Sequence, residues 1–288
     1  MKSKLTVLFI GSAGNSIPLN ATQRKKFQRL SNIGKIHVLA MIGDGRHLHR
    51  WRECGCQFVG VPLSLPRWRR NLWFLWSSAV ETIRLARSTP NLVVVTQSPQ
   101  HAVIPLLLRY IGYRYKVIVE THGDWLDGYF LYHSFRFKRF AYRTLKWIGI
   151  YTFRHADAIR TISDATRRLL PAEGKPIYQF PTFTDLDLFT EAAKKRGQLL
   201  ESQGTSQDIL FVGSLIRLKG VDDLLTAFEK IADKHPITRL IFVGEGAKRE
   251  ELQERAKAVA LADRVFFTGQ LPQHELAERM ASAYCLVL

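Results

Sequence analysis

The sequence is most informative at Phe211-Val-Gly-Ser-Leu-Ile-Arg-Leu-Lys-Gly220, which runs into Val221-Asp-Asp-Leu-Leu-Thr-Ala-Phe228. An apolar run meets Gly213, a short loop ends in Lys219-Gly220, and apolar residues then recur at helical spacing. The segment predicts a strand, a turn and a helix with a lysine at its amino end. Backbone N–H groups, the helix dipole and one cation suit a phosphate or diphosphate. Taken alone, the segment also fits an ordinary strand-to-helix turn with a solvated lysine.

Short apolar runs alternate with longer helical patterns along the rest of the chain. The predicted strands are Leu5–Ile10, Ile36–Met41, Gln57–Val61, Leu92–Thr96, Val117–Glu120, Ala158–Ile162, Ile177–Phe180, Ile209–Val212, Arg239–Val243, Val265–Thr268 and Cys285–Leu288. The main predicted helices are Trp73–Arg87, Ala102–Ile111, Phe135–Phe153, Val221–Lys234, Arg249–Ala260 and Gln273–Ala283. This alternation predicts an α/β fold of parallel sheets with helices on both faces.

A polar, glycine-containing segment, Thr190–Asp208, separates two series of strands and predicts two domains. We expect residues 1–190 to form one doubly wound domain, 191–207 to be a linker, and 208–288 to form part of a second domain. Parallel sheets bind ligands at the carboxyl ends of their strands, so we expect a cleft where those ends of the two domains meet.

The net charge of +17 is distributed unevenly. Residues 1–190 hold 28 lysines and arginines against 11 acidic residues, whereas residues 191–288 hold 14 of each. The first part is therefore expected to meet an anionic partner, which is a membrane surface, a nucleic acid or an anionic substrate.

The three cysteines do not form a disulfide framework, and we do not interpret the pair Cys54 and Cys56 as ligands of a metal ion. We expect reduced thiols in a cytosolic compartment and no metal site. The apolar run after Met1-Lys-Ser-Lys4 is too short for a signal peptide, and no apolar stretch reaches the length of a membrane span.

Several further blocks, in order, carry a family resemblance. They are Ile159-Arg-Thr-Ile-Ser-Asp-Ala-Thr166, Phe180-Pro-Thr-Phe-Thr-Asp-Leu-Asp-Leu-Phe189, Phe211–Phe228, Leu240-Ile-Phe-Val-Gly-Glu-Gly246 and Val265-Phe-Phe-Thr-Gly-Gln-Leu271. Through them nearly the whole chain resembles the family 4 glycosyltransferases of the GT-B fold, also called glycosyl transferases group 1. The resemblance implies two Rossmann-like domains that face a cleft, and a nucleoside-diphosphate sugar bound as a substrate without a cofactor.

The resemblance implies a donor site in the second domain. Lys219 takes the family's lysine position beside the departing diphosphate. The family commonly has Arg where this chain has Ser214, and Arg217 is the candidate for the missing cation. The expected donor-binding residues are Gly213, Ser214, Arg217, Lys219, Gly244, Glu245, Gly246, Gly269, Gln270 and Leu271. Plain turns remain an alternative for the loops at Glu245 and Gln270.

In the first domain, His122 directly follows a predicted strand, and the family often has a His here beside the donor sugar and diphosphate. Asp124 is a candidate acceptor contact. Gly11, Gly14 and Asn15 resemble the family's N-terminal glycine loop, but they lack the G-x-G-x-x-G fingerprint of a dinucleotide site. A structural histidine and an empty turn are the alternatives at these places.

Cations stand beside large aromatic residues in two segments of the first domain. One is Phe135–Phe153 with Arg136, Arg139, Arg143 and Lys146, and the other is Pro66-Arg-Trp-Arg-Arg70 followed by Leu72-Trp-Phe-Leu-Trp76, with Trp68 and Trp73. With the excess charge, they predict contact with an anionic membrane interface. Core helices with solvated basic faces remain the alternative.

We therefore expect a retaining glycosyltransferase, cytoplasmic and peripheral at the inner membrane face, that acts on a lipid-linked or cell-envelope saccharide. The pair Asp185-Leu-Asp187 has D-x-D spacing, but it matches the family's interdomain block. Rival hypotheses are another GT-B enzyme, such as a nucleotide-sugar epimerase, and a non-catalytic module that binds anionic membranes or nucleic acid. RNA-recognition signatures are absent from the sequence, so nucleic acid is not the expected partner.

In the family, the strand corresponding to Ala283–Leu288 leads into a glycine-containing loop and an E-x₇-E element that holds the donor's ribose and sugar. The sequence stops at Leu288. The resemblance therefore implies an incomplete second domain and a 288-residue chain that is itself inactive in transfer.

Overall fold

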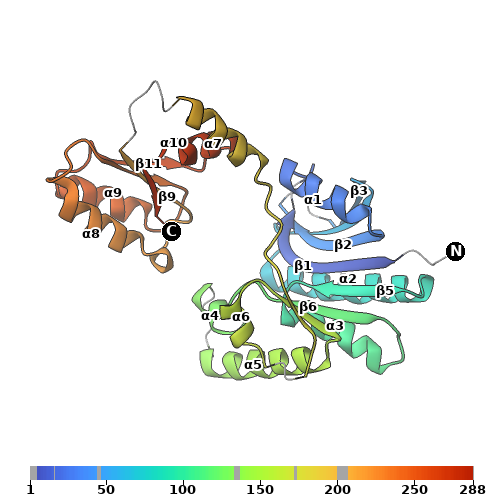
Figure 1. The fold of residues 1–288 in the computed structure, drawn as a ribbon. Helices are drawn as coiled ribbons and strands as arrows, with labels where there is room; N and C mark the ends of the chain where they lie inside the picture. Colours follow the sequence, from blue (N-terminus) through green and yellow to red (C-terminus); the bar gives the residue numbers. More distant parts are fainter. Residues whose placement is uncertain are drawn as a thin grey trace. The chain divides into compact units, whose positions relative to one another are not determined.

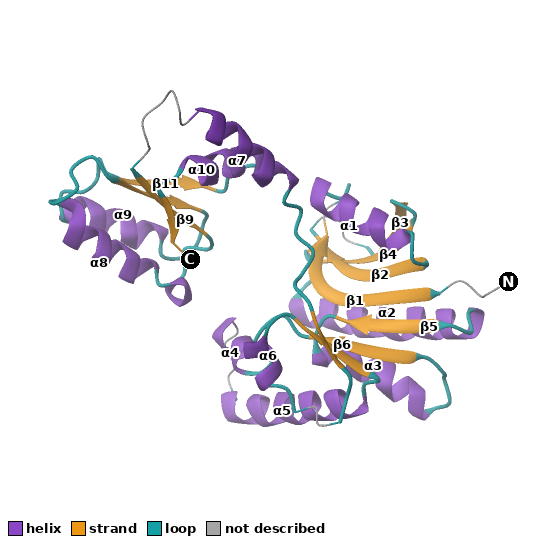
Figure 2. Ribbon diagram, in the orientation of Figure 1, coloured by secondary structure: helices purple, strands orange, loops and turns teal. Residues whose placement is uncertain are grey.

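The computed structural model describes residues 5–15, 17–43, 47–132, 137–171, 174–199 and 207–287. The chain divides after Thr184 into two compact units. Each unit is built on one sheet, and helices cover both faces of it (Figure 1, Figure 2). The predicted alternation of strands and helices is confirmed in both.

The first unit contains an eight-stranded sheet in the order β3-β4-β2-β1-β5-β6-β7-β8, parallel except for the antiparallel pair β3–β4. Its strands are β1 (Thr6–Asn15), β2 (Lys35–Ile42), β3 (His49–Glu53), β4 (Cys56–Pro62), β5 (Leu92–Thr96), β6 (Lys116–Glu120), β7 (Ala158–Thr161) and β8 (Ile177–Gln179). Its helices are α1 (Ala21–Ser31), α2 (Arg67–Ser88), α3 (Pro99–Tyr110), α4 (Asp127–Tyr132), α5 (Lys138–His155) and α6 (Asp164–Arg168).

The central strands of this sheet are apolar on both faces, as strands buried between two helical layers must be. In β1, Leu8 and Ile10 contribute to the core beneath α2, α3 and α5, whereas Val7 contributes to the smaller core beneath α1. Because side chains alternate along a strand, one apolar run serves both layers.

The second unit contains a four-stranded parallel sheet in the order β11-β10-β9-β12. Its strands are β9 (Asp208–Val212), β10 (Arg239–Val243), β11 (Val265–Gly269) and β12 (Cys285–Val287). Its helices are α7 (Asp187–Leu199), the short 3₁₀ helix η1 (Arg217–Lys219), α8 (Val221–Ala232), α9 (Arg249–Ala258) and α10 (Gln273–Ser282). Helices α8 and α9 cover one face of the sheet, and α10, which contacts α7, covers the other.

Helix α8 forms where the sequence predicts it because its apolar residues fall on one side. Val221, Leu225, Phe228 and Ala232 are all buried against the sheet. Asp222 and Asp223 in its first turn favour the positive end of the helix dipole. The helix is therefore fixed in place close behind the Lys219 loop.

Four elements of the first unit were not predicted from the sequence: the short helices α4 and α6, and two polar elements, β3 and α1. Strand β3 is an edge strand of charged and aromatic residues without apolar alternation. Helix α1 buries only Phe27, and a capping box of Asn20 and Gln23 supports its start. Neither element carries a strong periodic signal, since each has little surface to bury.

The structure also corrects the predicted linker. Residues 191–199 belong to α7, which packs against α10 with Ala192 buried. Their polar, lysine-rich composition indicated a linker because most of this helix faces solvent. In addition, α2 begins at Arg67, six residues before the predicted start of that helix.

Candidate functional site

The loop after β9 holds Lys219 at the amino end of α8. The N–H of Lys219 donates to the carbonyl of Ile216 (2.9 Å), and the N–H of Gly220 donates to that of Arg217 (3.1 Å). Gly220 has φ 65°, a left-handed conformation that glycine adopts without strain, and it turns the chain directly into α8. The turn brings Lys219 beside the N–H groups of the first helical turn, which have no intrahelical acceptor.

The cations of this loop are free to meet a ligand. Arg217, Lys219 and Ser214 are exposed. Within the described part of the chain, neither Arg217 nor Lys219 has a hydrogen bond or ion pair through its side chain. Of the two acidic residues in the first turn of α8, Asp222 forms an ion pair with Lys248 (3.3 Å). The loop itself carries two cations, which with the free N–H groups of α8 suit an anion, although the exposed carboxylate of Asp223 in the first turn of α8 offsets part of this charge.

Backbone hydrogen bonds join the three predicted donor loops. The N–H of Gly213 donates to Val243 (2.9 Å), that of Leu215 donates to Glu245 (2.9 Å), and that of Gly244 donates to Gly269 (2.9 Å). The ends of β9, β10 and β11 are thus brought together as the sequence predicted.

Close contacts between the backbones of these loops require glycine at two positions. A Cβ at Gly244 would lie 2.0 Å from the carbonyl oxygen of Gly213, and Gly244 has φ 138°. A Cβ at Gly246 would lie 2.3 Å from the carbonyl oxygen of Leu215. Both glycines therefore allow the loops to pack backbone against backbone, and this positions the Lys219 loop.

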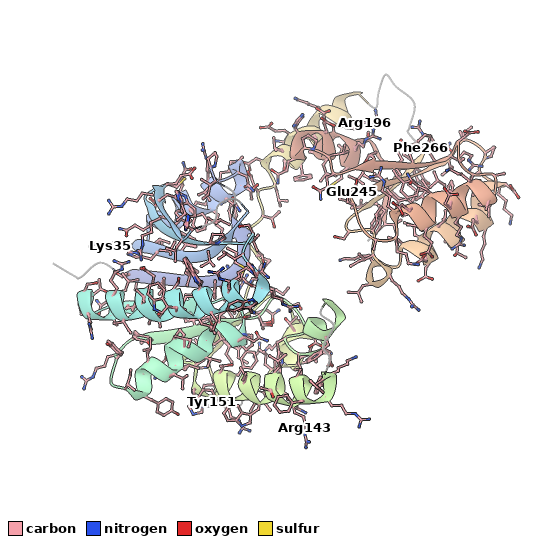
Figure 3. The ribbon with its side chains drawn as sticks, turned by 180° about the vertical axis from the view of Figure 1, so that it is seen from behind. Lys35, Arg143, Tyr151, Arg196, Glu245 and Phe266 are labelled. Atoms are coloured by element: carbon pink, nitrogen blue, oxygen red, sulfur yellow. The ribbon has the colours of Figure 1, made fainter. Side chains whose placement is uncertain are left out.

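The other predicted donor-loop residues lie in different surroundings. Glu245, labelled in Figure 3, is exposed and forms an ion pair with Arg249. Gln270 is exposed, whereas Leu271 packs against the core beneath α10. The side chain of Leu271 is thus occupied, and only its backbone is left to contact a ligand.

In the first unit, His122 follows β6 and is partly exposed. Its Nε2 lies 3.5 Å from Oε2 of Glu120, and its Nδ1 lies 3.4 Å from Oγ1 of Thr182. Neighbours therefore flank both nitrogens of the ring, while the side chain as a whole stays 40% exposed. Asp124 has a structural contact, because its Oδ1 accepts from the N–H groups of Leu126 (2.9 Å) and Asp127 (2.8 Å) at the start of α4.

The predicted glycine loop after β1 is instead a continuation of the strand. Gly11, Gly14 and Asn15 belong to β1, which pairs with β2 through an irregularity between Ile10 and Gly14. Gln97 fills the space above Gly11, where a Cβ would lie 1.8 Å from its Oε1. The side chain of Asn15 lies outside the described residues.

The sequence analysis missed a charged cluster beside His122. Arg160 at the end of β7 is 6% exposed, and its Nη1 lies 3.8 Å from Oε1 of Glu120. Its Nη2 donates to the carbonyl of Phe180 (2.9 Å), and its Nε is buried without a partner. Burial lowers the pKa of Lys26 on α1, although nearby Glu120 raises it. In the sequence, this cluster is indicated only by a single charged residue near the end of each of two apolar strands, Glu120 in β6 and Arg160 in β7.

The predicted basic and aromatic surface is carried by α2 and α5. Trp68 and Trp76 are 66% and 64% exposed, and with Arg69, Leu72 and the half-buried Trp73 they line a surface hollow of ≈ 490 Å³. On α5, Phe140 and Trp147 are 75% and 68% exposed.

The cations of α5 lie on the same exposed surface. Arg139, Arg143 and Lys146 are exposed, and Figure 3 shows Arg143 on the outer side of the helix. Arg136 lies outside the described residues. The carboxyl-terminal part of α5 packs into the core, where Phe153 is buried, whereas Phe140 and Trp147 stay exposed, so a core helix with a solvated basic face does not account for these two rings.

The described residues contain neither a candidate membrane span nor a cluster of metal ligands. No helix there is both long and apolar enough to cross a membrane. No group of three or more His, Cys, Asp or Glu residues in that part of the chain is arranged to hold a metal ion.

Two family models match the chain: the glycosyl transferase 4-like domain over residues 35–178, and glycosyl transferases group 1 over residues 194–288. Over 187 residues the chain is 27% identical to a GDP-mannose-dependent alpha-(1-6)-phosphatidylinositol monomannoside mannosyltransferase of Mycolicibacterium smegmatis, covering 63% of this chain and 46% of that protein. Over 245 residues it is 28% identical to a 2-deoxystreptamine N-acetyl-D-glucosaminyltransferase of Streptomyces fradiae, covering 78% and 57%. The chain thus spans about half the length of these curated relatives.

Among solved structures, the chain is similar to a sucrose-phosphate synthase from Thermosynechococcus elongatus. The TM-score is 0.69 at 18% identity, covering 98% of this chain and 74% of that one. This likeness concerns the fold alone, and it confirms the predicted α/β GT-B fold.

Proposed function

The chain belongs to the glycosyltransferases of the group 1 and 4-like families, and from this premise we propose that its site serves the transfer of a sugar from a nucleoside-diphosphate sugar to a hydroxyl group of a lipid-linked or cell-envelope saccharide. The anomeric configuration is retained. The observation that carries the donor half of the proposal is the Lys219 loop, which presents two unpaired cations at the amino end of α8.

The donor loops suit the charge that develops in the reaction. As the bond to the anomeric carbon breaks, negative charge accumulates on the departing nucleoside diphosphate. Lys219 and Arg217 stabilise this charge together with the free N–H groups of α8, because such groups need no reorganisation as the charge forms. Ser214 donates a further hydrogen bond in place of the family's arginine.

We assign His122 to the sugar part of the donor. Its side chain is 40% exposed, and Glu120 and Thr182 restrict its rotation. A side chain held in this way orients a ligand hydroxyl at lower entropic cost than a freely rotating one. We assign Asp124 to the start of α4 rather than to the acceptor.

The membrane half of the proposal rests on the aromatic and basic surface of α2 and α5. Exposed tryptophan rings beside arginines and lysines fit an anionic bilayer interface, where rings lie at headgroup depth and cations meet lipid phosphates. The mycolicibacterial relative is named for a phosphatidylinositol mannoside acceptor. An acceptor anchored in the membrane would therefore meet the first unit where its charge is concentrated, in the cytoplasm at the inner face of the membrane.

A donor-binding experiment tests the proposal. Nucleoside diphosphates and their sugars are titrated against the chain, Lys219→Ala and the matched control Lys230→Ala, which removes an exposed lysine from the same α8. We expect saturable binding by the unmodified chain. Lys219→Ala should weaken it at least about tenfold, because one charge-assisted contact is lost. Lys230→Ala should leave the affinity unchanged. Equal binding by all three proteins, or no binding by any of them, would refute the proposal. With a bound donor, release of free sugar instead of transfer would point to the epimerase class.

A further inference from the structure

A polar pocket lies in the first unit where α2 meets strands β2, β3 and β4, whereas His122 follows β6. It has a volume of ≈ 410 Å³. Its charged and polar lining includes His37 on β2, Arg50 and Arg52 on β3, Gln57 on β4, and Glu81 and Arg84 on α2. Figure 3 labels Lys35, which marks the amino-terminal end of β2 two residues before His37. From His37 the strand runs five residues to its carboxyl end, roughly 16 Å at 3.3 Å per residue.

The one acidic group of the pocket is already neutralised. Glu81 is 1% exposed. Its Oε1 accepts from Arg50, and its Oε2 accepts from Nε (2.9 Å) and Nη2 (2.7 Å) of Arg84. Both carboxylate oxygens are therefore occupied, and Glu81 has little capacity left for a cation or for a further donor.

His37 lines the pocket, and one of its two ring nitrogens contacts Arg84. Nη2 of Arg84 lies 3.4 Å from its Nδ1. Burial and the nearby Arg84 lower the pKa of His37, so the ring is neutral at neutral pH. An arginine only donates, so Nδ1 is the acceptor of this contact and the proton lies on Nε2.

Two further donors lack partners. Neither Arg52 nor Gln57 has a side-chain hydrogen bond or ion pair within the described residues. Three arginines, one glutamate and a neutral histidine give the pocket a net charge of about +2, counting full side-chain charges. Donors and positive charge are in excess, and unpaired acceptors are scarce.

We propose that this pocket binds a small phosphomonoester, whose dianionic phosphate group is held by Arg52, Gln57 and the Nε2–H of His37. The charge of such a group matches the excess in the pocket. The volume lies within the range of about 300–1,000 Å³ that is usual for small-molecule sites, and it leaves space for a polar group beyond the phosphate. All residues that line the pocket belong to the first unit, whereas the donor loops belong to the second.

Calorimetric titration with glycerol phosphate and inorganic phosphate, at constant ionic strength, tests the proposal. Every protein carries Lys219→Ala, so that anion binding at the donor loop does not contribute. Arg52→Gln is compared with Arg87→Gln, which removes the same charge from α2 outside the pocket, where Arg87 contacts Tyr113. Gln57→Leu is the second variant, because it removes a donor without changing the charge.

We expect one saturable site that Arg52→Gln weakens about tenfold or more, the loss of a charge-assisted hydrogen bond, whereas Arg87→Gln leaves it unchanged. Gln57→Leu should weaken it less. Tighter binding of the ester identifies the ester as the ligand, and equal affinity identifies free phosphate; both support a dianion site. Absence of saturable binding, or equal loss in the two arginine variants, overturns the proposal. Neither result depends on the Lys219 loop, so the outcome is distinct from that of the donor experiment.

Discussion

Replacing Gly244 with alanine tests whether backbone contact between the loops holds the donor site in place. The new Cβ would lie 2.0 Å from the carbonyl oxygen of Gly213, at a residue whose φ is 138°. Alanine at such a φ costs about 1–3 kcal/mol. Relief of the contact requires Gly213 and Gly244 to move apart, which breaks the hydrogen bonds from Gly213 to Val243 and from Gly244 to Gly269.

Each of those hydrogen bonds is worth about 1 kcal/mol net. The expected loss in free energy of unfolding of the second unit is therefore about 3–5 kcal/mol, enough to lower its melting temperature by at least about 12 °C for a domain of this size. All six tryptophans lie before residue 185, so tryptophan fluorescence reports the first unit, and far-UV circular dichroism reports both.

The matched control is Gly213→Ala. Its Cβ would meet nothing closer than the edge of the Phe211 ring at 3.3 Å, and its φ lies outside the left-handed region. We expect this control to unfold close to the wild type. For Gly244→Ala, the early transition should appear in circular dichroism without a matching shift in fluorescence. If the two variants have equal stability, or if fluorescence shifts as far as circular dichroism, the reasoning about loop contact is refuted.

Two other predictions concern the first unit. Burial lowers the pKa of His101 from 6.5 to about 4. Between these two pH values the unfolded chain binds a proton at His101 and the folded chain does not, so the free energy of unfolding falls as the pH is lowered from about 6.5 towards 4. The loss is at most about 3 kcal/mol, because His101 is not fully buried. Urea unfolding followed by fluorescence should show a smaller loss for His101→Gln, and an unchanged slope would contradict this. Trp68→Ala combined with Trp76→Ala should weaken binding to anionic phosphatidylglycerol vesicles at least about tenfold in a flotation assay. Tyr284→Ala, which removes an exposed aromatic from the second unit, should leave that binding unchanged, and equal effects of the two changes would argue against the surface of α2 and α5.

The central strands and the donor loops could be predicted from the sequence because one physical constraint dominates each. A run such as Leu92–Thr96 must be buried on both faces, and few structures other than a parallel strand allow this. Gly244 and Gly246 follow such a strand, where a backbone turn needs residues without a Cβ. At these positions the local sequence pattern and the tertiary structure require the same residue types, namely apolar residues in the strand and glycines in the loops.

Pairings between distant residues could not be predicted. The contact between Glu120 and Arg160 depends on the adjacency of β6 and β7, and the contact of Glu81 with Arg50 depends on how α2 lies against the edge of the sheet that carries β3. Charged residues in polar segments resemble solvated ones until their neighbours are known. The acceptor role of Asp124 stays a prediction with the same ambiguity, since a carboxylate after a strand also suits the start of a helix.

The charge of the chain links these separate features. The whole excess of 17 positive charges lies within residues 1–190, and the remainder is balanced, so pairing within the chain cannot neutralise it. On α2 and α5 the cations are exposed, and physiological salt screens them beyond about 8 Å. Lys26, Arg160 and His37 are more enclosed, where screening is weaker and an unpaired charge or donor costs more. The exposed cations therefore suit a broad surface such as a membrane, and the enclosed groups are the stronger markers of specific anionic ligands.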